Sequence, residues 1–208
     1  MTRKFLLGLG LSAASVALVG CAIYVAPTRE ETLQVVKSSF RERGIAKLDR
    51  LNQSDLQQAC SEAALAGTEL SKDVRARLER QALSTVKLPA DGAYFGDFKQ
   101  GERIAQTGVG LQWSDNDKTV AGGNCYACHQ IAPQEIAHGN IGPSLQGYGK
   151  LRGNSQAVVS YTWGKLYNSH AYNACSPMPR YGDANILTTA QLKDLMSLLL
   201  DPNSPVNK

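Results

Sequence analysis

Two cysteines separated by two residues and followed at once by a histidine constrain this chain more than any other feature. The stretch is Cys125-Tyr126-Ala127-Cys128-His129, and its Cys-x-x-Cys-His spacing is the attachment signal for a c-type haem. Two thiols at this spacing can each add to one vinyl group of the same porphyrin. The adjacent imidazole then lies beneath the iron as its proximal ligand. The motif therefore predicts one covalently attached haem c, held by Cys125 and Cys128 and ligated by His129.

Other uses of a Cys-x-x-Cys pair fit this sequence less well. A thioredoxin-like redox pair does not need the histidine that follows and occurs within a βαβ pattern, which this sequence lacks. A structural zinc site needs two more cysteine or histidine ligands at close spacing, and the sequence has none nearby. Haem attachment is therefore the preferred interpretation.

A second stretch, NACSPMPRYG at residues 173–182, predicts the source of the other axial ligand. Met178 lies there between Pro177 and Pro179, and prolines fix the backbone and exclude a helix. Methionine sulfur is a neutral ligand that raises the reduction potential of haem iron. A stiff loop lowers the entropy cost of holding the side chain on the far side of the ring. Met178 is therefore the predicted distal ligand.

The chain has three methionines, and the other two have different explanations. Met1 starts the chain, and Met196 belongs to an apolar stripe with helical spacing, so it is expected in the core. Two alternatives remain for the distal side of the iron: Met178 only covers the edge of the haem, or His170 is the axial ligand. His138 is expected at the surface.

A third segment, Ile141-Gly142-Pro143-Ser144-Leu145-Gln146-Gly147-Tyr148, resembles the Gly-Pro-x-Leu-x-Gly loop of class I cytochromes c. In that family the proline carbonyl accepts the ring N–H of the proximal histidine and fixes its orientation. The resemblance implies that Pro143 holds His129 in this way. The candidates for packing on the haem are Leu145, Tyr148, Trp163 and Tyr167, for which plain core packing is the competing interpretation. The candidates for pairing with the haem propionates are Arg152 and Arg180, for which a solvated surface charge is the competing interpretation.

The N-terminus has the pattern of an export signal. Arg3 and Lys4 precede an uncharged run over residues 5–26, as in a secretory signal. Leu18-Val19-Gly20-Cys21 also resembles a bacterial lipoprotein box, in which Cys21 would carry lipid. An uncleaved membrane anchor is the alternative, because a run of this length can just span a bilayer. The protein is therefore expected in the periplasm, at the membrane only if Cys21 is lipidated or the N-terminal segment is retained.

The rest of the chain divides near Gly92. Residues 27–91 are polar with helical spacing, and three helices are expected there, capped by Thr28, by Ser54 or Asn52, and by Ser71. Residues 92–208 contain the haem motifs. The expected fold is all-α, a class I cytochrome c domain behind an N-terminal helical extension.

Two helices of the cytochrome domain can be anticipated from the sequence, over residues 101–108 and from residue 189 to about residue 200. In class I cytochromes the corresponding helices cross at a glycine, and Gly101 is placed for that approach. The formal charge of +4 is not gathered into a block, which argues against a nucleic-acid partner.

Cysteine arithmetic predicts a crosslink. Of five cysteines, two belong to the haem motif, which leaves Cys21, Cys60 and Cys175. If Cys21 is lipidated or removed with the signal, Cys60 and Cys175 are the remaining pair, and an oxidising compartment favours their disulfide. Two buried thiols are the alternative.

Taken together, the haem motif, the two loops and the tail resemble the SoxX family of monohaem cytochromes c. The matching segments are residues 122–129, 140–145, 148–152, 175–182 and 187–206. The resemblance implies an electron-transfer subunit of a SoxAX complex, with no catalytic residue of its own. Its SoxA-type partner joins thiosulfate to a cysteine of the carrier SoxYZ, and a small soluble cytochrome c takes the electrons. The alternatives are a free-standing electron shuttle and a haem enzyme with an open iron site.

Overall fold

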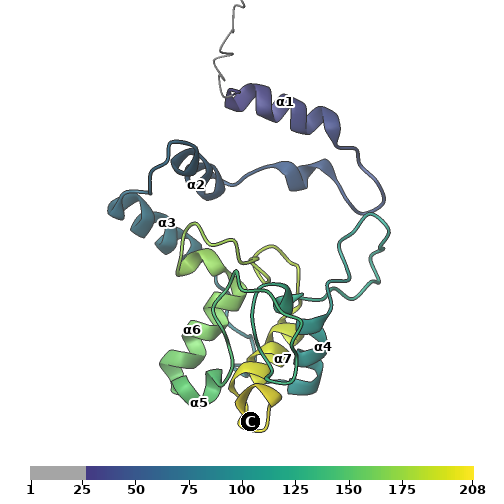
Figure 1. The fold of residues 1–208 in the computed structure, drawn as a ribbon, viewed down its shortest axis with the longest axis vertical. Helices are drawn as coiled ribbons and strands as arrows, with labels where there is room; N and C mark the ends of the chain where they lie inside the picture. Colours follow the sequence, from purple (N-terminus) through teal and green to yellow (C-terminus); the bar gives the residue numbers. More distant parts are fainter. Residues whose placement is uncertain (1–26) are drawn as a thin grey trace, which may run out of the picture.

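The computed structural model describes residues 27–208, and there it contains helices and one isolated bridge but no strand (Figure 1). The predicted signal segment and Cys21 lie outside the described residues. The α-helices are α1 (Arg29–Ser39), α2 (Asp55–Leu65), α3 (Lys72–Ser84), α4 (Phe98–Gln106), α5 (Tyr148–Arg152), α6 (Gln156–Tyr167) and α7 (Thr189–Leu200). Four short 3-10 helices are η1 (Leu48–Leu51), η2 (Cys125–Ala127), η3 (Ser169–Ala171) and η4 (Pro205–Asn207). The all-α expectation is confirmed.

The helices of the extension begin where local capping chemistry places them. The side chain of Thr28 accepts from the backbone N–H of Glu31, and the Glu31 side chain accepts from the backbone N–H of Thr28. The two hydrogen bonds form a capping box on α1. Ser54 and Gln57 form the same box on α2, so Ser54 rather than Asn52 is the cap. Ser71 caps α3. These starts follow from the sequence because a cap involves only neighbouring residues.

Helices α4 and α7 pack directly against each other and form the centre of the cytochrome domain (Figure 1). Gly101 on α4 makes this close approach possible. A Cβ atom at that position would fall on the backbone carbonyl of Asp194 and 2.9 Å from Cβ of Leu198. The crossing at a glycine is therefore as predicted. Ile104 and Ala105 on the same face of α4 are buried in the core.

The start of α4 differs from the expectation. The helix runs from Phe98 to Gln106 rather than over residues 101–108. Its cap is Asp97, whose carboxylate accepts from the backbone N–H of Lys99 at 2.8 Å. The backbone N–H of Asp97 in turn donates to Oδ1 of Asp194 on α7 at 2.8 Å. The sequence prediction missed this start because part of the cap comes from a residue far along the chain.

We expect Gly101→Ala to lower the free energy of unfolding by about 1–3 kcal/mol, because the added methyl group forces α4 away from α7. Urea unfolding of the purified protein measures this. The matched control is Lys99→Ala, at an exposed position of the same helix. Equal stability of the two variants would show that the helices have room to separate.

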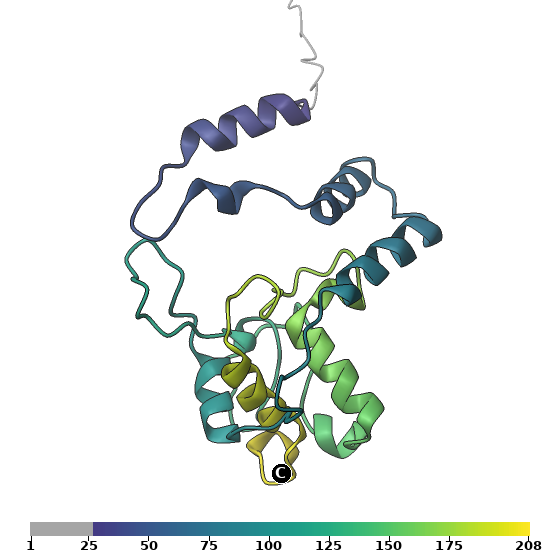
Figure 2. The same cartoon turned by 180° about the vertical axis from the view of Figure 1, so that it is seen from behind.

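The extension forms an arch over the cytochrome domain, seen from both sides in Figures 1 and 2. Helix α1 has no buried residue. One foot of the arch meets the loop before η2, where the Arg43 guanidinium lies 3.4 Å from the centre of the Trp113 ring. At the other foot α3 buries Leu78 and Ala82. No helix of residues 27–208 is long and apolar enough to cross a membrane.

Candidate haem site

The attachment motif folds as one tight 3-10 turn, η2. Asn124 precedes it with a left-handed backbone (φ 47°), and the backbone N–H of His129 donates to the carbonyl of Cys125 at 2.9 Å. Within residues 27–208, the thiols of Cys125 and Cys128 are not in disulfides, and both side chains are half-buried. The turn thus presents two reduced sulfurs and an imidazole from five consecutive residues.

The imidazole of His129 is oriented by the Gly-Pro loop. Its Nδ1 lies 2.7 Å from the carbonyl oxygen of Pro143, the contact that the loop resemblance implies. A carbonyl oxygen only accepts, so Nδ1 carries the proton and Nε2 keeps the lone pair that can bind a metal. The preceding residue must be glycine, because a Cβ atom at Gly142 would fall on the imidazole ring.

The loop that carries Met178 is held by hydrogen bonds at its backbone. The Ser169 hydroxyl donates to the carbonyl of Met178 at 2.6 Å, and the N–H of Met178 donates to Oγ of Ser176 at 3.2 Å. The Met178 side chain is half-buried and packs against the same hydrophobic core as Cys125 and Leu145. The thioether and the attachment turn therefore border one core.

Tyr181 ties the methionine loop to the attachment turn. Its hydroxyl donates to the backbone carbonyl of Gly123 at 2.5 Å. Burial raises the pKa of Tyr181, and it raises the pKa of Cys125 to about 11. The phenol therefore keeps its proton and remains a donor at neutral pH. Tyr181 stands three residues after Met178, and Gly123, which accepts from it, stands two residues before Cys125.

Removal of that phenol tests the tie. We expect Tyr181→Phe to lower the free energy of unfolding by about 1–2 kcal/mol, since the Gly123 carbonyl loses its donor in a buried setting. Thermal or urea unfolding of the protein measures the change. Tyr161→Phe, at an exposed ring on α6, is the control and should be neutral.

The packing candidates lie in or beside the core. Leu145 packs on the edge of the core, and buried Tyr148 shares a hydrogen bond of 2.9 Å with Thr162. Trp163 is 1% exposed, and its indole N–H donates to the carbonyl of Lys87 at 2.9 Å. Trp163 thus holds the segment between α3 and α4 against the core, as the core-packing interpretation expects.

The two arginines differ. Arg152 is exposed at the end of α5, with its guanidinium 5.3 Å from the Tyr148 ring centre. Arg180 is half-buried and forms an ion pair of 2.9 Å with Asp183. Pairing of either arginine with a haem propionate stays a prediction.

The two remaining histidines have separate environments. His138 is exposed, as expected. His170 is buried, and its Nε2 donates to the carbonyl of Ser176 at 3.2 Å. Burial lowers the pKa of His170, and the charge of Arg180 adds to the effect. The Nε2 atom of His170 is thus used within the loop, and the choice between Met178 and His170 as the distal ligand stays a prediction.

Sequence reasoning missed two residues near the attachment turn. One is Tyr181, although it stands in the stretch that was singled out. The other is Glu102 on α4, whose Oε1 accepts from the Tyr126 hydroxyl at 2.7 Å. The Glu102 Oε2 atom is buried without a hydrogen-bond partner among residues 27–208. Glu102 looks in the sequence like an ordinary charged residue of an amphipathic helix, so its contact with Tyr126 could not be predicted.

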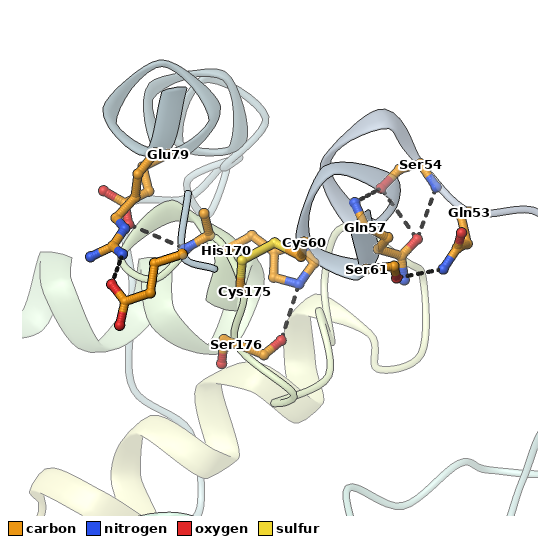
Figure 3. The surroundings of a disulfide bond; sticks show 12 residues. Gln53, Ser54, Gln57, Cys60, Ser61, Glu79, His170, Cys175 and Ser176 are labelled. Carbon is orange, nitrogen blue, oxygen red and sulfur yellow. Dashed lines mark hydrogen bonds and ion pairs between the residues drawn. A yellow bond between two sulfur atoms is a disulfide. The ribbon is translucent and has the colours of Figure 1, made fainter. Parts of the chain in front are cut away.

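The disulfide predicted between Cys60 and Cys175 is present in the structure (Figure 3). It joins α2 to the methionine loop, and the two cysteines are separated by 115 positions in the sequence. The bond lies three residues before Met178. The extension is thus covalently attached to the loop that presents the thioether.

These donors fit a covalently bound haem. Two unpaired thiols at the attachment spacing, an imidazole with Nε2 available and a thioether from a separate loop are the set that such a group requires. Tyr181 and Pro143 show that both sides of the site are fixed by hydrogen bonds. Among the described residues, no cluster of three or more histidine, cysteine or acidic side chains offers a competing metal site.

Comparison with known proteins agrees with this chemistry. Residues 114–201 match the protein family described as cytochrome c. The chain is also 33% identical, over 215 aligned positions, to a protein of Aquifex aeolicus (strain VF5) named "Uncharacterized lipoprotein". That alignment covers the whole of both chains.

Proposed function

This chain carries a cytochrome c domain and belongs to the same family as the Aquifex lipoprotein, and from that premise we propose that it transfers electrons through a single haem c ligated by His129 and Met178. When bound, haem c supplies an iron that takes up and releases one electron. The observation that carries the proposal is the link between the two loops. Tyr181 binds the Met178 loop to the turn of Cys125 while Pro143 orients His129 from the other side.

The chain's own residues set what this site can do. Cys125 and Cys128 would anchor the group, and His129 and Met178 would ligate its iron. An iron ligated in this way would offer no position to a substrate, which favours electron relay over an oxidase or peroxidase. The thioether and the buried core around it both favour the reduced state and a high potential, as suits an electron acceptor.

The finer role that we propose is that of the SoxX subunit in a SoxAX complex. The support is the sequence resemblance of the methionine loop and the tail, together with an extension that is attached to that loop by a disulfide. On this proposal a SoxA-type subunit oxidatively couples thiosulfate to the SoxYZ cysteine. This chain accepts the electrons released and passes them to a small soluble cytochrome c.

We also propose that the protein is exported and held at the membrane by lipid on Cys21. The Aquifex relative is named a lipoprotein, and residues 18–21 resemble a lipoprotein box. The Cys60–Cys175 disulfide agrees with an oxidising compartment.

One preparation tests these proposals in order. The protein is made in a host with cytochrome c maturation, and its intact mass reports the number of haems and the N-terminal residue. Gel filtration is then run with and without a SoxA-type subunit. We expect one haem, lipid on Cys21 and a heterodimer. A single haem without complex formation would instead identify a free-standing shuttle.

A further inference from the structure

A cavity of about 390 Å³ lies between α2 and the segment that carries Met178; Figure 3 labels several of its lining residues around the disulfide. Residues of α2 and the residue before its cap form one wall, and residues between His170 and Ile186 form the other. No residue of the attachment turn or of the Gly-Pro loop lines it. Its volume is within the range of about 300–1,000 Å³ that is usual for small-molecule sites.

The polar part of the lining consists of one cation, the Arg180 guanidinium, and uncharged groups. It contains one guanidinium, one imidazole, two amides and two hydroxyls: Arg180, His170, Gln53, Gln57, Ser61 and Ser176. Among the described residues, none that lines the cavity is an aspartate or a glutamate. An anion in this cavity would meet the Arg180 guanidinium and uncharged donors, with no carboxylate in the lining itself.

Hydrogen bonding within the wall leaves donors facing the space. Gln57 uses its Oε1 atom at the cap of α2, where it accepts from the backbone N–H of Ser54 at 2.9 Å, so its NH₂ group remains. Arg180 gives one guanidinium nitrogen to Asp183 at 2.9 Å. Its planar fork has further N–H groups, which suit a planar or trigonal oxyanion.

The rest of the lining is apolar and rigid. It comes from the Cys60–Cys175 disulfide, Met178, two prolines and aliphatic side chains of both walls: Leu56, Ala174, Pro177, Pro179, Ala184 and Ile186. A ligand that fills such a space needs a charged head for the donors and a compact apolar body for this surface.

We propose that this cavity binds a small organic oxyanion, a carboxylate or sulfonate on a compact apolar body, beside the loop that carries Met178. The inference goes beyond electron transfer and rests on the donors of Arg180, Gln53 and Gln57. Donor groups from α2 and from the loop converge there, so the extension supplies half of a binding site.

The test uses benzoate as the probe and the mature, haem-loaded protein. Calorimetric titration should show saturable binding of one benzoate for each chain. Benzyl alcohol, a neutral molecule of similar shape, should bind at least tenfold more weakly, since the guanidinium and amide donors are then unmatched.

Gln57→Glu is the decisive variant, because glutamate at this position keeps the capping box and adds a negative charge to the wall. We expect the affinity for benzoate to fall about tenfold or more. Gln81→Glu makes the same charge change at an exposed position of α3 that does not line the cavity, and should leave the affinity unchanged. Gln53→Glu repeats the test at an exposed lining residue.

Three outcomes would overturn the proposal: no saturable binding of benzoate, equal affinity for benzoate and benzyl alcohol, or equal weakening by Gln57→Glu and Gln81→Glu. The haem absorption spectrum, recorded on the same samples, checks that each variant is folded. A failure here leaves the haem count, the spectrum and the electron-transfer proposal unaffected, so the two can be judged separately.

Discussion

Replacing Met178 with alanine is expected to lower the midpoint potential of the haem by on the order of 0.1 V or more, within the span of about 0.8 V that axial ligands control. Loss of the thioether removes the soft ligand that stabilises ferrous iron. The same change should abolish the weak charge-transfer absorption of sulfur-ligated ferric haem. Potentiometric titration and absorption spectroscopy measure the two effects on one sample.

Two further variants make this result specific. Met196→Leu removes a methionine that is fully buried in the core and should leave the spectrum and potential unchanged, with a stability loss below about 1.5 kcal/mol. His170→Ala removes the rival ligand. If His170→Ala rather than Met178→Ala abolishes the native spectrum, the ligand assignment is wrong, although the attachment by Cys125 and Cys128 would stand.

The features that the sequence predicted correctly came from neighbouring residues, from a family resemblance and from the count of cysteines. Thr28 and Glu31 cap a helix from three residues apart, and their contact is formed within one turn. Gly101 was placed by the resemblance to class I cytochromes c, whose two helices cross at a glycine, and the structure shows why a larger residue would clash there. The disulfide of Cys60 and Cys175 followed from counting.

Features that depend on distant partners were not predictable in this way. Helix α4 starts at Phe98 because Asp194, almost a hundred residues later, accepts from its cap. The hydroxyl of Tyr181 reaches Gly123 across the site. The donor-lined cavity likewise exists only because α2 folds back onto the methionine loop. Pairings of this kind are decided by tertiary packing, for which a single sequence carries no periodic signal.

Removal of the disulfide, by Cys60→Ser with Cys175→Ser, should lower the free energy of unfolding by about 4–5 kcal/mol on the chain-entropy model. The bond closes a loop across 115 residues, so the reduced chain gains a large ensemble of unfolded states. Urea unfolding of the haem-loaded double variant against the parent protein measures the loss. Because two residues change at once, the two single variants, Cys60→Ser and Cys175→Ser, are measured as well. They show how much an unpaired thiol alone affects stability.

The same double variant separates an effect on the unfolded chain from an effect on the native loop. Other contacts of the extension with the cytochrome domain remain: the N–H of Ala174 in the loop donates to Glu79 at 3.1 Å, and the side chain of Asn168, just before η3, donates to Thr85 at 2.9 Å. If these contacts suffice to hold the loop, stability falls while the midpoint potential stays at the parent value. If the potential falls as well, the disulfide also positions Met178 in the folded protein. A loss of stability below about 1 kcal/mol would contradict the entropic argument, since a loop of this length cannot be closed at so small a cost.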